Sequence, residues 1–348
     1  MDYIDILKNF KLSVSDAEIY FESTLTGGHI NGTKLISLSS GKYILQTINQ
    51  SVFHDINILE DNLREIRKCF NDDSSDKDFN PVSIPNYIED ISGALITQRS
   101  SGAYRLYPYI TPCNEADIDI NDRIKISAFA FGKYISMISD CLLRATIPCY
   151  HDPDHYSKLL RTAITNNSLY EKYDDMLDKI SKIENIVQRS LPAFLPMRNI
   201  HGDASVKNII ITDHNTGAAV VIDLDTSFPG YAASDFGDLV RSSLDLIRKS
   251  YGKKVLSDSL IIQTIKDITS AYLRGTDQIL TQKEIHSLIP GIIRVDCELA
   301  MRYLTDAISH SSYFDKTPEE CMERASDLID DALCIIRIKN NLSVSYDL

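Results

Sequence analysis

The spacing of hydrophobic residues divides the chain into a strand-rich first part and a largely helical remainder. In two runs, 33–39 and 43–49, β-branched and aromatic residues alternate with polar ones around a short Ser-Gly turn. Alternation around a short turn predicts a β-hairpin. Two further runs, 94–99 and 104–110, predict that this hairpin is part of a small antiparallel sheet.

Helical spacing, with an apolar residue at every third or fourth position, marks most of the remaining chain. In the first part it predicts a helix over 56–70, and a capping-box spacing predicts a short helix over 15–21. The later predicted helices cover 123–144, 156–165, 173–191, 235–251, 258–273, 283–309 and 318–338. A second predicted hairpin, with strands at 208–212 and 219–223, interrupts them.

The length indicates two domains or one large two-lobed unit, and the predicted strands and helices indicate an α+β protein. The chain has 348 residues, of which 43% are hydrophobic and 24% charged, so it can form a large core and is not disordered. We place a small strand-rich lobe at 1–110 and a larger helical lobe at 111–348.

Charge and targeting signals exclude several classes of protein. The net charge is −13 and no basic cluster is present, so we expect no nucleic-acid partner. No apolar run reaches the ~18 residues that a membrane span needs, and the chain does not begin like a secretory signal. None of the seven cysteines forms a C-x-x-C pair. We therefore expect a cytoplasmic protein with reduced thiols and no membrane partner.

The second hairpin is flanked by polar residues suited to phosphoryl transfer. An H-G-D motif at 201–203 precedes its first strand, Asn208 follows Asp203 by five residues, and Asp223 ends its second strand. Amide and carboxylate oxygens suit Mg²⁺, and an Asp five residues before the Asn is the spacing of a kinase catalytic loop. Each motif alone is also common in turns and at strand ends. Together they predict Asp203 as the base and Asn208 and Asp223 as metal ligands.

The sequence resembles the aminoglycoside phosphotransferase and choline kinase-like superfamily. The signature of that superfamily is H-G-D, an Asn five residues later, and I-D-x-[DE], which lies here at 222–225. Motifs elsewhere are most similar to its N-acetylhexosamine 1-kinase branch. They are G-H-I-N at 28–31, Y-I-L-Q-T-I-N at 43–49, Y-R at 104–105, Y-I at 109–110, I-P at 147–148, Y-H-D at 150–152, the segment 221–229 and R-Y-L-T-D at 302–306. The resemblance implies a two-lobed, protein-kinase-like fold.

The resemblance also implies roles for residues around the base. Asp235 would brace the site through backbone contacts, and His201 would be a structural residue beside the base. Asp225 would be either a second carboxylate near the metal or a structural group. The implied nucleotide-binding residues are Gly27, Gly28, Gln46, Tyr109 and Ile110, the last two facing adenine in the hinge. The implied acceptor-binding residues are His29, Arg302 and Tyr313. The alternatives are a plain tight turn for Gly27 and Gly28, an exposed loop residue for His29, and a solvated or salt-bridged helical residue for Arg302.

Three departures from the family pattern bear on the substrates. Kinases place a Lys two residues after the base, where this chain has Ser205 and carries Lys207 instead. The strand that bears a nucleotide-binding Lys in protein kinases offers Gln46 and Thr47. The branch also uses a Trp that this chain lacks.

The expected activity is phosphorylation of an N-acetylhexosamine at its anomeric hydroxyl, with ATP (or GTP) and Mg²⁺. The alternatives are a kinase of another small acceptor, such as an aminoglycoside, an amino alcohol or another sugar, and a nucleotide-binding pseudokinase scaffold.

Overall fold

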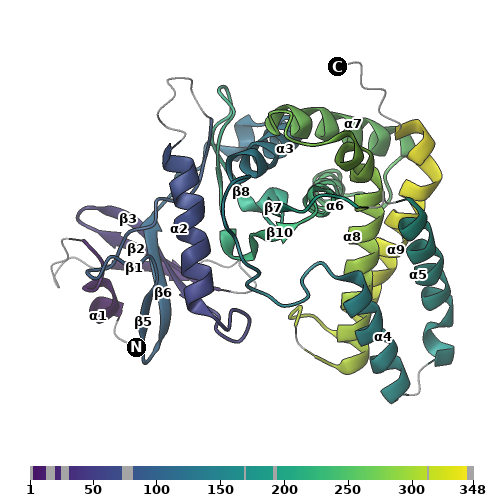
Figure 1. Ribbon diagram of the computed structural model, residues 1–348, viewed down its shortest axis with the longest axis horizontal. Helices are drawn as coiled ribbons and strands as arrows, with labels where there is room; N and C mark the ends of the chain where they lie inside the picture. The colour runs from purple at the N-terminus through teal and green to yellow at the C-terminus, as the bar shows by residue number, and fades with distance from the viewer. Residues whose placement is uncertain are drawn as a thin grey trace. The chain divides into compact units, whose positions relative to one another are not determined.

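The computed structural model divides the chain into two compact units (Figure 1). It describes residues 3–12, 20–24, 31–72, 81–167, 170–190, 194–311 and 313–342. The first unit comprises Met1–Ile118, Met137–Pro148 and Ile209–Phe228, and the second comprises Asp119–Ser136, Cys149–Asn208 and Pro229–Leu348. The units are interleaved along the chain, whereas the predicted lobes were separated by one boundary at residue 110.

A five-stranded antiparallel sheet, in the order β1-β2-β3-β6-β5, is the main element of the first unit. Its strands are β1 (Tyr20–Thr24), β2 (Gly32–Leu38), β3 (Gly41–Ile48), β5 (Thr97–Arg99) and β6 (Gly102–Pro108). The predicted hairpin and sheet are confirmed. The helix predicted to reach residue 21 is wrong at its end, because residues 20–24 pair with β2 as a strand.

Helices cover part of this unit. Helix α2 (Ile56–Asp72) matches its prediction, and a short helix α1 (Tyr3–Leu7) adds Ile6 and Leu7 to the core beneath the sheet. Cys69 of α2 and Cys141 lie with their sulfur atoms in contact, so the structure brings these two of the seven cysteines together.

The second predicted hairpin belongs to the first unit because a strand from that unit extends it. Strands β8 (Ile209–Asp213) and β9 (Ala218–Val221) pair antiparallel, and β4 (Val82–Ser83) adds to β9 in parallel. A 3₁₀ turn, η5 (Leu224–Thr226), follows β9, and another, η4 (Val206–Asn208), precedes β8.

The second unit is mainly helical. Its helices are α3 (Ile120–Met137), α4 (Pro153–Asn167), α5 (Tyr170–Ser190), α6 (Ala232–Tyr251), α7 (Asp258–Gly275), α8 (Gln282–Ser309) and α9 (Pro318–Ile338). Capping boxes at Thr281 and Thr317 begin α8 and α9, and the predicted starts at 283 and 318 fall within one residue of the observed ones. Two short strands that were not predicted, β7 (Arg198–Ile200) and β10 (Phe228–Gly230), form a two-stranded sheet.

Helix α8 is the centre of this unit and packs against α4, α5, α6 and α9, as Figure 1 shows. Glycines allow α6 and α8 to approach closely, because a Cβ on Gly291 would collide with the carbonyl oxygen of Ala233. Asp238 of α6 and Glu298 of α8 lie within 3.6 Å of the same side chain, that of His151. No helix in the described part of the chain is long and apolar enough to cross a membrane.

Candidate active site

The H-G-D turn follows strand β7 and is held by a buried carboxylate on α6. Asp235 accepts hydrogen bonds from the backbone N–H groups of His201, at 2.7 Å, and Gly202, at 2.8 Å. Burial raises the pKa of Asp235 to about 6, although both hydrogen bonds and His201 favour the charged form. Asp235 therefore fixes the peptide that leads into Asp203.

A second group, His151, holds the same turn from its carbonyl side. The Nε2 atom of His151 donates to the carbonyl oxygen of Gly202 at 2.8 Å. Glu298 on α8 and Asp238 on α6 lie 3.3 and 3.6 Å from the ring nitrogens. Burial alone would lower the pKa of His151, but Glu298 and then Asp238 outweigh it and raise the pKa to about 9. His151 is therefore protonated at neutral pH. The Y-H-D motif at 150–152 gives no indication of this contact from sequence alone.

His201 is fully buried and supports the turn by packing. Its ring lies edge-to-face against Phe131 and Tyr134 of α3, with centroid distances of 5.2 and 5.5 Å. Its Nδ1 atom accepts a hydrogen bond from the backbone N–H of Asp203 at 3.3 Å.

Asp203 is an ionised and partly exposed carboxylate. Asn208 donates to its Oδ2 atom at 2.9 Å and to its carbonyl oxygen at 2.8 Å. Burial favours the neutral acid, but Lys207, 3.7 Å away, and then His201 lower the pKa of Asp203 below its ordinary 3.8. The side chain keeps 26% of its surface exposed. Asp203 can therefore accept a proton at neutral pH from a group that approaches from solvent.

Asn208 and Asp223 stand at the outer ends of the β8–β9 hairpin. Asn208 directly precedes β8, and Asp223 comes two residues after Val221, the partner of Ile209. Asp223 adopts a left-handed conformation with φ of 62°, which is uncommon for a residue other than glycine. Its carboxylate and the amide oxygen of Asn208 are hard oxygen donors of the kind Mg²⁺ prefers. The residue types therefore fit a magnesium site.

Asp225 lies in a buried polar network within the first unit. The two terminal nitrogens of Arg105 contact its two carboxylate oxygens, one of them at 2.9 Å, and Asn31 donates to the same carboxylate at 2.6 Å. Thr146 donates to its carbonyl oxygen at 2.7 Å. Gln46 accepts from the Nε atom of Arg105 at 2.8 Å. The motifs that contain Gln46 and Arg105 predict a nucleotide contact for Gln46 and no role for Arg105, whereas the structure joins the two side chains.

The remaining nucleotide-site candidates are described only in part. Gly27 and Gly28 lie outside the described residues. Tyr109 directly follows β6, has 36% of its surface exposed, and donates its backbone N–H to the carbonyl of Lys42 at 2.8 Å. Ile110, the next residue, is half-buried.

Arg302 and Tyr313, two of the three acceptor candidates, are in direct contact. Arg302 on α8 donates to the hydroxyl of Tyr313 at 2.9 Å. Four aromatic rings surround its guanidinium carbon at 5.1–5.6 Å, those of Tyr150, Tyr156, Tyr313 and Phe314. Tyr150 is half-buried and within electrostatic reach of both Asp203 and Arg302; desolvation first, and then Asp203, raises its pKa. The third candidate, His29, lies outside the described residues.

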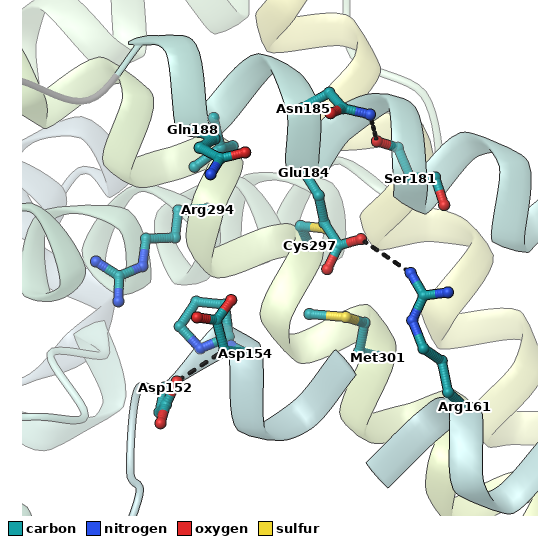
Figure 2. Close-up of a pocket in the computed structure, with 12 residues that line it drawn as sticks. Asp152, Asp154, Arg161, Ser181, Glu184, Asn185, Gln188, Arg294, Cys297 and Met301 are labelled. Carbon is teal, nitrogen blue, oxygen red and sulfur yellow. Dashed lines mark hydrogen bonds and ion pairs between the residues drawn. The ribbon is translucent and has the colours of Figure 1, made fainter. Parts of the chain in front are cut away.

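A separate cavity of about 560 Å³ lies among α4, α5 and α8 (Figure 2). Arg294 and Met301 reach it from α8, and Arg161 and Glu184 form an ion pair beside it at 3.9 Å. Asp203 and Arg302 do not belong to its lining.

A sheet-rich unit combined with a helical unit that carries an H-G-D turn defines a protein-kinase-like fold with a candidate phosphotransfer site. Residues 23–254 match the model of the phosphotransferase enzyme family. The chain belongs to this family and is a small-molecule phosphotransferase, so the expected fold class and enzyme class are confirmed.

Solved structures of related folds cover nearly the whole chain. A spectinomycin phosphotransferase in complex with ADP and spectinomycin is similar at a TM-score of 0.62 and 13% identity, over 96% of this chain and 98% of that one. A choline kinase from Cryptosporidium parvum gives 0.59 and 14%, over 98% and 97%. An aminoglycoside phosphotransferase from Alicyclobacillus acidocaldarius gives 0.58 and 12%, over 97% and 95%. At these identities the likeness concerns the fold.

Proposed function

We propose that this protein transfers the terminal phosphoryl group of ATP, with Mg²⁺, to a hydroxyl group of a neutral sugar-like acceptor. The first choice of acceptor is an N-acetylhexosamine, at its anomeric hydroxyl. The motifs at 28–31, 43–49 and 302–306 support this branch of the family, and the ADP complex of the spectinomycin enzyme supports the nucleotide.

The observation that carries the acceptor class is the surroundings of Arg302. A guanidinium group carries only hydrogen-bond donors and a permanent positive charge. It therefore repels cationic acceptors such as choline or an aminoglycoside, and it attracts hydroxyl and carbonyl oxygens. Tyr150 relates the two groups, because its ring lies 5.5 Å from the guanidinium carbon of Arg302 and Asp203 contributes to the rise in its pKa.

In this proposal each charged residue has one task. Asp203 accepts the proton of the acceptor hydroxyl, and Asn208 holds the carboxylate of Asp203 in place by its side-chain hydrogen bond. Lys207, which is about half exposed beside Asp203, supplies positive charge on the acceptor side. Magnesium, held by Asn208 and Asp223, would supply neutralisation of the phosphate charge. The braces on the H-G-D turn, Asp235 and His151, keep the base oriented.

The test is an ATP-consumption screen with N-acetylhexosamines, neutral hexoses, choline and spectinomycin, with NMR identification of any product. Arg302→Ala should raise the KM for the acceptor by about tenfold or more, because losing a charged hydrogen-bond partner costs about 1.4 kcal/mol or more. The KM for ATP should stay unchanged. Arg161→Ala, which alters an arginine whose side chain is 69% exposed, is the matched control and should change neither constant.

Three results would contradict the proposal. A wild-type preference for choline or spectinomycin would reject the neutral acceptor. Equal losses for ATP and acceptor in Arg302→Ala would make Arg302 a structural residue. Nucleotide binding without turnover for any acceptor would favour the scaffold reading.

A further inference from the structure

We propose that the buried Arg105–Asp225 pair positions Asp223, and that it thereby sets the gain in nucleotide affinity that Mg²⁺ provides. The inference rests on the proposed function, in which Asp223 is the metal ligand. It assigns Asp225 a role as a positioning residue and not as a second metal ligand, and it gives Arg105 a role that no motif assigned.

The pair joins segments that lie far apart in the chain. Arg105 is on β6 and Asp225 in η5, and both side chains are 1% exposed. Gln46 on β3 fixes the Nε atom of Arg105, and Asn31, before β2, fixes one carboxylate oxygen of Asp225. Asn31 is itself held, because its Oδ1 atom accepts the backbone N–H of Asn49 at 2.9 Å. Each member of the network is thus oriented by another.

The hydrogen bonds of the pair leave neither side chain free to bind a metal ion or a phosphate group. Both carboxylate oxygens of Asp225 receive hydrogen bonds, and all three guanidinium nitrogens of Arg105 donate to Asp225 or Gln46. Freeing either group for a metal ion or a phosphate would leave a buried charge without its partner, which is costly. The ring of Tyr87 lies 5.4 Å from the guanidinium carbon of Arg105. The pair can therefore influence a bound metal ion only by positioning the residues next to it in the chain.

The nearest functional neighbour is Asp223, which holds an unfavourable backbone conformation. A left-handed residue other than glycine costs on the order of 1 kcal/mol and persists only where its surroundings impose it. Here the carboxylate of Asp225 is fixed by Arg105 and its carbonyl by Thr146, and the N–H of Ser227 donates to the carbonyl of Leu224 at 3.1 Å. Asp223 directly precedes this turn, and only Leu224 separates it from Asp225. The direction of the Asp223 carboxylate therefore depends on the pair.

Stability alone does not explain such a pair, because replacing both partners of a buried ion pair with neutral groups is often neutral or stabilising. This allows a test that separates positioning from folding. The double variant Arg105→Met with Asp225→Asn removes both charges and leaves an amide oxygen for Asn31. Calorimetry then measures ADP affinity in Mg²⁺ and in EDTA, with thermal unfolding as the check on the fold.

We expect the double variant to fold, to bind ADP in EDTA within about twofold of wild type, and to lose at least tenfold of the affinity gain from Mg²⁺, or about 1.4 kcal/mol. The control is the pair Arg198–Glu284 of the second unit, whose carboxylate is also buried. Arg198→Met with Glu284→Gln should change thermal stability without changing the Mg²⁺ gain.

If the double variant does not fold, Arg105→Lys is the alternative variant for the same measurement. It retains the charge but cannot bridge both oxygens of Asp225, so it should also reduce the Mg²⁺ gain. If a folded variant kept the wild-type gain in ADP affinity from Mg²⁺, this inference would be overturned and the proposed function would stand. If the ADP affinity of the wild-type protein were the same with and without Mg²⁺, both the proposed metal site and this inference would be overturned.

Discussion

The protonated state of His151 predicts a loss of stability between neutral and alkaline pH. His151 donates to the carbonyl of Gly202 and faces two carboxylates, Glu298 and Asp238. Replacing it with Asn removes the charge and keeps a side-chain donor. We expect wild-type protein to be more stable than His151→Asn at pH 6.5 and the difference to shrink as the pH rises.

The magnitude follows from the pKa. A folded-state pKa of about 9 against an ordinary 6.5, at about 1.4 kcal/mol per pKa unit, corresponds to on the order of 3 kcal/mol. Because the folded-state pKa is the higher one, this stabilisation is complete below pH 6.5 and is lost as the pH rises through about 9. Asp235, whose pKa is about 6, has largely titrated below this range and contributes little to the slope.

Urea unfolding at half-unit intervals from pH 6 to 9.5 measures the effect. The exposed His286 provides the control, since His286→Asn should reproduce the wild-type slope. Turnover should fall with stability above pH 8, because neutral His151 no longer offers a charged donor to the turn that carries Asp203. An equal slope in wild type and His151→Asn would refute the argument and would mean that the ring is neutral at pH 7.

Two further predictions concern the proposed chemistry. Asp203→Asn should lower kcat by about 10²–10⁴-fold, the usual share of a general base, while ADP binding and the unfolding temperature stay nearly unchanged; a wild-type kcat would remove Asp203 from the mechanism. Asp223→Ala should make ADP affinity insensitive to Mg²⁺ and should abolish turnover, as calorimetry with and without the metal can show. If the Mg²⁺ dependence persisted in Asp223→Ala, another residue would have to be the ligand.

The parts of the fold that the sequence predicted well are those specified by local signals. The helices predicted over 283–309 and 318–338 begin within one residue of α8 and α9, whose first turns are closed by capping boxes at Thr281 and Thr317. A similar spacing at Ser15 predicted a helix through residue 21, but pairing with β2 makes residues 20–24 a strand. Strand β4 was missed because two residues have no periodicity, and its partner β9 lies far along the chain.

The same distinction applies to the candidate site. The contact between Asn208 and Asp203 spans five residues, so their spacing was informative. Arg105 and Asp225 are 120 residues apart, and no local pattern links a buried arginine to one carboxylate among many. The charge of His151, which lies outside any helix, depends on acids from α6 and α8. Sequence can name such residues as members of motifs, but only the tertiary packing determines their partners and ionisation.

The rings around Arg302 form an aromatic cage whose cation is supplied by the protein itself. Without the guanidinium group, three phenol rings and one phenyl ring would border the vacated space. Proteins hold quaternary ammonium groups in such surroundings. In the proposed acceptor site, one substitution at residue 302 would therefore exchange surroundings that repel cations for surroundings of the kind that hold them. Directed evolution toward choline-like acceptors would accordingly begin at residue 302.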